Sequence, residues 1–76
     1  MENRVRQILA DIFGRPVEDI NDNASTDTVE EWDSLSNVYL VLALETEFGV
    51  KLTMEEMSRL VSFKNIIALL KEKRVA

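Results

Sequence analysis

The most apolar part of the chain is Asp33 to Gly49, which reads DSLSNVYLVLALETEFG. The segment opens with an aspartate, whose carboxylate can accept hydrogen bonds from the N–H groups of a first helical turn. It closes with glycine, the residue type that most often ends a helix in the left-handed conformation. Apolar residues recur between them at helical spacing, and no proline interrupts them. We therefore predict a helix from Ser34 to Phe48.

This helix has an apolar surface on two opposite sides when its residues are placed on a wheel at 100° per residue. One side suits packing against other helices and carries Leu40, Val41, Ala43, Leu44 and Phe48. The other side carries Ser34, Leu35, Val38, Tyr39, Leu42 and Glu45. Either the helix is nearly central in the fold, or the second side binds a partner. The alternative for this side is that Val38 and part of Tyr39 pack beneath the preceding loop, and we predict such packing for Val38. The predicted contacts with partner proteins are Leu35, Tyr39, Leu42 and Glu45.

The N-terminal segment predicts an amphipathic helix followed by a long loop. Its apolar residues, spaced by three and four, are Val5, Ile8, Leu9, Ile12 and Phe13. Gly14 and Pro16 end this helix, because glycine permits a left-handed turn and proline cannot continue the helix. Residues 15–33 show no sustained period and predict a loop, with helical turns near residues 16–20 and 29–32.

Two more helices are predicted in the C-terminal part. A short helix over residues 54–60 begins at a capping box, in which Thr53 caps the helix and Glu56 reaches back to it. A last amphipathic helix over residues 63–73 is capped by Ser62. The chain therefore predicts an all-α fold, a small four-helix bundle of three main helices and one short helix with a long first loop.

The length of 76 residues predicts one domain, residues 1–76. A chain this short buries only about 60% of the surface that its unfolded form exposes, so its core is small. It has no room for a deep enzyme cleft between two lobes.

Charge is distributed unevenly along the sequence. The segment 16–50 has no Lys or Arg, and its nine acids are Glu18, Asp19, Asp22, Asp27, Glu30, Glu31, Asp33, Glu45 and Glu47. Such a segment repels nucleic acid and attracts proteins with basic patches. The alternative is that these acids only keep a small protein in solution.

No feature of the sequence indicates a membrane or an oxidising compartment. The N-terminus lacks the apolar stretch of a signal peptide, and there is no cysteine. The longest apolar run, Val38 to Leu44, has seven residues, far fewer than a membrane span needs. We therefore expect a cytoplasmic protein, and a monomer.

Ser34 is the first residue of the predicted central helix. A helix N-terminus has unpaired N–H groups and a partial positive charge, and it therefore favours an attached phosphate. A serine nucleophile would need a general base, but the chain has no histidine, and no Gly-x-Ser-x-Gly elbow surrounds Ser34. The residues thus exclude a serine hydrolase, and leave open a serine that merely begins a helix.

The segment 33–56, DSLSNVYLVLALETEFGVKLTMEE, resembles the central part of acyl carrier proteins. The resemblance extends over the whole chain, from the first helix through PVEDI after Arg15 to the last amphipathic helix. It implies a 4′-phosphopantetheine arm, transferred from coenzyme A to Ser34 by a phosphopantetheinyl transferase. It also implies that Asp33 supports attachment by helping to hold the transferase's Mg²⁺. Such carriers are not enzymes: they present acyl groups as thioesters to loading and processing enzymes.

Three residues depart from the common pattern of this family. Ser36 and Tyr39 stand where many fatty-acid carriers have acids, and Trp32 precedes the Asp-Ser-Leu triplet. These departures favour a specialised member and leave the pathway open among fatty acid, polyketide, aminoacyl, lipid and saccharide-modifying systems. The alternative function is a helical protein–protein interaction module without a covalent arm, which would use the same apolar side.

The loop Asp19 to Glu30 partly matches a calcium loop. Oxygen-bearing side chains stand at the required positions, at Asp19, Asn21, Asn23, Asp27 and Glu30. Ala24 occupies the position where the sharp turn needs glycine, and Pro16 lies where the incoming helix should already have formed. We therefore expect no true calcium site here, only weak and nonspecific binding of divalent cations.

Overall fold

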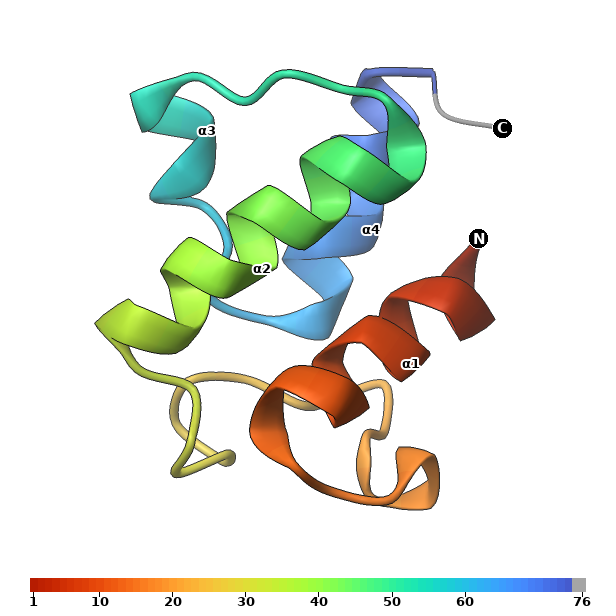
Figure 1. The fold of residues 1–76 in the computed structure, drawn as a ribbon, viewed down its shortest axis with the longest axis vertical. Helices are drawn as coiled ribbons and strands as arrows, with labels where there is room; N and C mark the ends of the chain where they lie inside the picture. Colours follow the sequence, from red (N-terminus) through yellow and green to blue (C-terminus); the bar gives the residue numbers. More distant parts are fainter. Residues whose placement is uncertain (75–76) are drawn as a thin grey trace.

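The computed structural model describes residues 1–74, which fold into helices and connecting loops (Figure 1). The elements in chain order are α1 (Glu2–Phe13), the 3-10 turn η1 (Val17–Asp19), α2 (Ser34–Phe48), α3 (Met54–Met57) and α4 (Phe63–Glu72). Pairing of β type within residues 1–74 is limited to one isolated bridge between Ser25 and Ser62. The predicted all-α class, with three main helices and one short one, is confirmed.

The core lies where α1, α2 and α4 meet, and α1 packs against both of the others. Figure 1 shows α4 behind α2, with α3 and α1 on opposite sides of the view. The large side chains with almost no exposure are Val5, Leu9, Ile20, Leu40, Leu44, Leu60, Ile66, Leu69 and Leu70. They come from α1, α2 and α4, from the first loop and from the α3–α4 connection. One continuous apolar cluster therefore stabilises the whole fold.

The predicted helix ends of α2 are confirmed in detail. The Asp33 carboxylate accepts a hydrogen bond from the backbone N–H of Ser36 at 2.9 Å, which satisfies one of the free donors of the first turn. Gly49 ends the helix at φ 63°, a left-handed conformation that costs glycine little. Because both ends are fixed by their own residues, Ser34 is held as the first residue of α2.

The two C-terminal helices begin as predicted but end earlier. Thr53 and Glu56 form the full capping box of α3, and Ser62 caps α4. The predicted extension of α3 to residue 60 is wrong, because the chain leaves the helix after Met57. The N–H of Leu60 instead donates to the Met57 carbonyl, a tighter turn that places Leu60 in the core.

The long first loop is an ordered layer against the bundle, seen in orange and yellow at the bottom of Figure 1. Its buried side chains are Ile20, Ala24, Val29 and Trp32. The loop is tied to the α3–α4 connection, because the N–H of Thr26 donates to the Val61 carbonyl and that of Phe63 to the Ala24 carbonyl. The predicted turn after Pro16 is present as η1, and the Trp32 N–H closes a turn onto Val29. This loop therefore fixes the position where α2 begins.

Candidate functional site

Ser34 lies exposed at the first position of α2. Within residues 1–74 its hydroxyl makes no hydrogen bond, whereas the hydroxyl of Ser36 donates to the Glu31 carbonyl at 2.6 Å. The two serines are close in sequence, but the hydroxyl of Ser36 is engaged in a hydrogen bond and that of Ser34 is free within the described residues. Ser34 can accept a new covalent group without breaking an existing contact.

Asp33 lies beside Ser34 and is held in an ionised form. The backbone N–H of Ser36, which donates to the carboxylate, lowers the pKa of Asp33 below its ordinary value. At neutral pH a carboxylate therefore stands next to the exposed hydroxyl. Carboxylate oxygens are ligands that Mg²⁺ accepts readily, especially together with phosphate oxygens.

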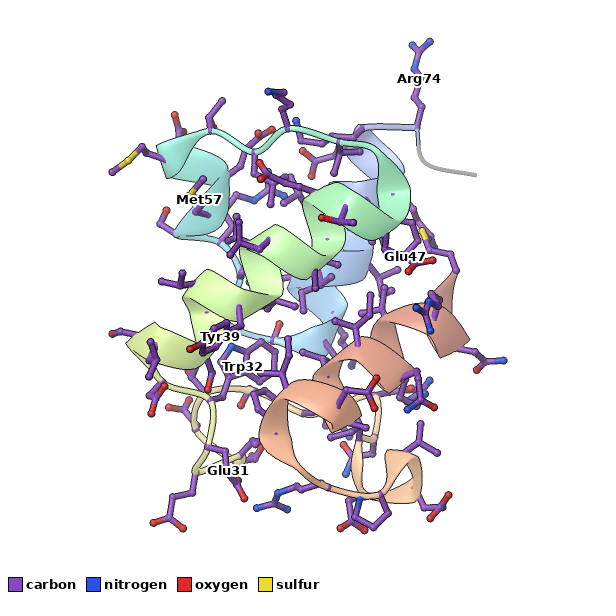
Figure 2. The ribbon with its side chains drawn as sticks, in the orientation of Figure 1. Glu31, Trp32, Tyr39, Glu47, Met57 and Arg74 are labelled. Carbon is purple, nitrogen blue, oxygen red and sulfur yellow. The ribbon has the colours of Figure 1, made fainter. Side chains whose placement is uncertain are left out.

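The outer side of α2 is apolar and exposed. The exposed fractions are 63% for Leu35, 55% for Val38, 55% for Tyr39 and 56% for Leu42. The prediction that Val38 packs beneath the loop is wrong, because the loop is tied to the α3–α4 connection and Val38 keeps more than half of its surface exposed. Tyr39 likewise keeps more than half of its surface exposed, and Figure 2 shows it near the N-terminal half of α2. We name Leu35, Val38, Tyr39 and Leu42 the outer stripe.

Glu45, the fourth predicted partner contact, is half-buried. Its carboxylate accepts a hydrogen bond from the backbone N–H of Leu52 at 3.0 Å. This bond ties the end of α2 to the α2–α3 connection. A role for Glu45 in partner contact stays a prediction.

A groove beside Ser34 brings in residues that the sequence did not single out. It has a volume of about 260 Å³ and is lined by Ser34, Asn37, Val38, Val41, Leu42 and Met57. Val41 stands seven residues after Ser34 and could have been placed on the same side by helical spacing. Met57 comes from α3, and no sequence pattern indicates that α3 lies there. A second groove, of about 350 Å³, lies around Phe63 and Ile67 and shares no residue with the Ser34 groove.

Trp32, one of the departures from the common family pattern, is a core residue. It is 4% exposed, and its ring centroid lies 5.4 Å from that of Phe13. Its indole N–H donates to the Asn37 side-chain oxygen at 2.8 Å, which joins the loop to the first turns of α2. Trp32 is labelled below α2 in Figure 2. Trp32 and Ser36 therefore both help to fix the start of α2.

Several acids of the segment 16–50 are paired with basic residues from outside it. The ion pairs are Asp22 with Arg6, Glu31 with Arg15 and Glu47 with Arg4, at 3.0, 2.8 and 2.7 Å. The guanidinium partners lower the pKa of Glu31 and of Glu47. Arg4 and Arg6 belong to α1, so their pairs fasten the end of α2 and the loop at Asp22 to this helix. Arg15 follows α1, and its pair with Glu31 joins the two ends of the long loop. Fewer carboxylates therefore remain available for partners.

The loop that partly matches a calcium site is organised by its own polar contacts. The Asn21 side chain accepts a hydrogen bond from the N–H of Asn23, and Ala24 is buried at 3% exposure. Across residues 1–74, no group of three or more His, Cys, Asp or Glu side chains is arranged to hold a metal ion. Among the same residues, no helix is both long and apolar enough to cross a membrane.

Comparison with known proteins assigns the family. Residues 3–70 match the sequence model of the phosphopantetheine attachment site. The chain is also similar to an acyl carrier protein from Petrotoga mobilis, with 33% identity over 70 residues that cover 92% of this chain and 82% of that protein. The chain therefore belongs to the phosphopantetheine attachment site family, as a non-catalytic carrier of the acyl carrier protein type whose prosthetic group is 4′-phosphopantetheine.

Proposed function

We propose that Ser34 carries the 4′-phosphopantetheine group and that the chain presents acyl groups, as thioesters on this arm, to partner enzymes. The observation that carries the proposal is the free hydroxyl of Ser34 at the first position of α2.

The state of the other serine hydroxyls supports this choice. Each of the other four serines uses its hydroxyl within the fold: Ser25 accepts from the N–H of Asp27, Ser36 donates to Glu31, Ser58 donates to Glu55, and Ser62 accepts from the N–H of Asn65. Modifying Ser36 or Ser58 would remove the hydrogen that each one donates. Modifying Ser25 or Ser62 would place a bulky group on an oxygen that already accepts a backbone N–H. Modifying Ser34 breaks none within residues 1–74.

The helix terminus supports a phosphate at this position. The Asp33 carboxylate accepts a hydrogen bond from the backbone N–H of Ser36, and the Asp33 backbone carbonyl accepts one from the N–H of Asn37. The N–H groups of Ser34 and Leu35 belong to the same first turn and add to the positive end of the helix dipole. A phosphodiester on the Ser34 oxygen thus gains favourable electrostatics that a phosphate in mid-helix would lack.

The attachment reaction balances with coenzyme A as the donor. The Ser34 oxygen forms a bond to the phosphorus next to pantetheine, and the phosphoanhydride bond of coenzyme A breaks. The adenosine bisphosphate part leaves, and the hydroxyl proton passes to a base of the transferase or to water. The ionised Asp33 suits a supporting role, because it can help to hold the Mg²⁺ that neutralises the phosphates.

Once attached, the arm supplies a thiol to a chain that has no cysteine. Acyl groups would be carried on that thiol, while partner enzymes perform the chemistry. We propose Leu35, Tyr39, Leu42 and Glu45 as the contacts with these enzymes, and the unpaired acids of the first loop as attractants for their basic patches.

The test uses the purified chain with coenzyme A, Mg²⁺ and a phosphopantetheinyl transferase. We expect the wild-type chain and the Ser36→Ala variant each to gain the mass of one phosphopantetheine group. The Ser34→Ala variant should gain none while keeping its helical circular dichroism. Modification of a folded Ser34→Ala variant would refute the site, and no gain by the wild-type chain would refute the carrier function.

A further inference from the structure

We infer that the side-chain NH₂ group of Asn37 donates a hydrogen bond to the phosphodiester of the arm on Ser34, and that Trp32 holds this NH₂ group in position. The inference rests on the proposed function of Ser34. It goes further because it names one side chain that binds the attached phosphate and a second one that orients the first. Asn37 is then a binding residue for the prosthetic group, and Trp32 is a positioning residue.

The orientation of the Asn37 amide follows from the chemistry of Trp32. An indole N–H is a donor only, so the atom that it meets at 2.8 Å must be the side-chain oxygen of Asn37. The inverted amide would instead bring two donors together. Trp32 is 4% exposed and its ring packs on Phe13, which keeps the indole in place. The Asn37 NH₂ group is therefore directed away from Trp32.

The Asn37 NH₂ group is free to bind a group from outside the chain. Within residues 1–74 the hydrogen bond of the Asn37 side chain is the one that its oxygen accepts from Trp32. Asn37 is half-buried, and among the same residues no buried side-chain nitrogen or oxygen lacks a partner. The NH₂ group must therefore reach the surface. By contrast, the NH₂ group of Asn65 already donates to the Arg59 carbonyl at 3.1 Å.

Ser34 lies one helical turn before Asn37. Side chains three residues apart on a helix share a face, with their Cβ atoms about 5–6 Å apart. Both residues line the same groove, of about 260 Å³. Helical side chains also lean toward the N-terminus, which brings the Asn37 amide toward the first turn. A phosphodiester on the Ser34 oxygen is therefore within reach of the Asn37 NH₂ group.

A phosphodiester is a group that such a donor suits. It is negatively charged, and a hydrogen bond to an ionised acceptor is shorter and stronger than one to a neutral acceptor. Because α2 has no Lys or Arg, neutral N–H donors are what this helix can offer to the phosphate. The ionised Asp33 next to Ser34 repels the phosphate, and the Asn37 donors offset part of that repulsion.

The first test compares the unmodified chain with the chain that carries phosphopantetheine, by NMR of isotope-labelled protein. The Asn37 NH₂ signals are identified by their loss in unmodified Asn37→Asp. We expect attachment of the arm to shift one Asn37 NH₂ proton downfield and to slow its exchange with water by about threefold or more. The Asn65 NH₂ group is the internal control and should not respond. Asn37 signals that stay unchanged in a fully modified chain would overturn the inference.

The Asn37→Asp variant separates the phosphate contact from the structural contact with Trp32. Its carboxylate still accepts from the indole N–H but has no hydrogen to donate. The chain has a single tryptophan, so the one indole N–H signal shows whether that contact is kept. We expect this signal to stay near its wild-type position. The phosphorus signal of the modified variant should move toward its position in the urea-unfolded chain.

Salt distinguishes loss of the donor from repulsion by the new carboxylate. In about 1 M NaCl the Debye length is about 3 Å, so repulsion between the carboxylate and the phosphate is strongly screened. The move of the phosphorus signal should persist there, because the missing donor is not restored. A phosphorus signal that matches the wild type, at either salt concentration, would show that Asn37 serves only the fold.

The Trp32→Phe variant tests the positioning role. It removes the donor that fixes the Asn37 oxygen and leaves the NH₂ group in the chain. The response of the Asn37 NH₂ signals to attachment should fall to about half, since the amide can then turn over about its last side-chain torsion. A full response in a folded variant would contradict the role of Trp32. A wild-type chain that gains no phosphopantetheine refutes the proposed function instead.

Discussion

The inner and outer sides of α2 have the same kinds of residues and opposite environments. Leu40 and Leu44 on the inner side have 1% and 0% exposure, whereas Leu35 and Leu42 on the outer side have 63% and 56%. The inner side packs on α1 and belongs to the continuous core. Nothing within residues 1–74 covers the outer side. The comparison teaches that apolar residues in a small bundle can exceed what its core needs, and that the excess is available for binding.

The largest expected effect comes from truncating the inner side. Leu44→Ala should lower the free energy of unfolding by about 2–5 kcal/mol, because it removes a fully buried side chain and leaves a cavity. Leu42→Ala, two residues earlier on the outer side, should change it by less than about 0.5 kcal/mol. Urea unfolding of both variants measures the difference. Equal losses would show that the outer side is also part of the folded core.

The junction between the loop and α2 should give the next largest effect. Trp32→Phe removes the indole N–H that donates to Asn37 and leaves unfilled volume beside Phe13. We expect a loss of about 1–2 kcal/mol in the free energy of unfolding. Unfolding followed by circular dichroism measures it, since the variant has no tryptophan fluorescence. An unchanged midpoint would contradict a structural role for Trp32.

Local signals in the sequence were enough to predict the helices and their caps. Asp33, Thr53, Ser62 and Gly49 each fix a helix end through hydrogen bonds or a φ value within a few residues. The end of α3 was missed because burial of Leu60, a contact between distant segments, overrides the local helical preference. Such an override cannot be seen in residue spacing.

For the candidate site, the sequence indicated which residues matter but not how they are used. Helical spacing placed Leu35, Tyr39 and Leu42 on the same side of the helix as Ser34, and the structure gives the exposure of each. Val38 was assigned to the wrong environment because spacing does not show where a long loop packs. Glu45 was predicted as a partner contact, and Trp32 was interpreted as the mark of a specialised family member. Their hydrogen bonds to Leu52 and Asn37 are visible only in three dimensions.

Acid should weaken the fold through the helix start and the ion pairs. Five carboxyl groups have a lowered pKa: Glu31, Asp33, Glu47, Glu56 and Glu72. Each of these carboxyl groups stabilises the folded chain fully at pH values above its pKa in the unfolded chain, which is about 4. This stabilisation is lost as the pH falls through the lower pKa that the group has in the folded chain. Asp33→Asn still caps the helix but does not titrate, so it should lose less stability between pH 7 and about pH 3 than the wild type. Urea midpoints at both pH values measure this, and an equal loss would contradict the assignment of Asp33.

The smallest expected effect on stability is on the outer side itself. Val38→Ser should change the free energy of unfolding by less than about 0.5 kcal/mol, because Val38 is already 55% exposed. Packing beneath the loop would instead make this change cost about 1 kcal/mol or more. Val41→Ser, on a nearly buried neighbour at 9% exposure, is the matched control and should be clearly destabilised.

The central claim is that the outer side of α2 is functional because Ser34 holds the arm. The most direct test is fragmentation mass spectrometry of the chain purified from its native host. We predict one phosphopantetheine group, bonded to the peptide residue Ser34 and carrying either a free thiol or an acyl thioester. An arm bonded to any other residue, or a chain that is never modified in its host, would contradict this claim.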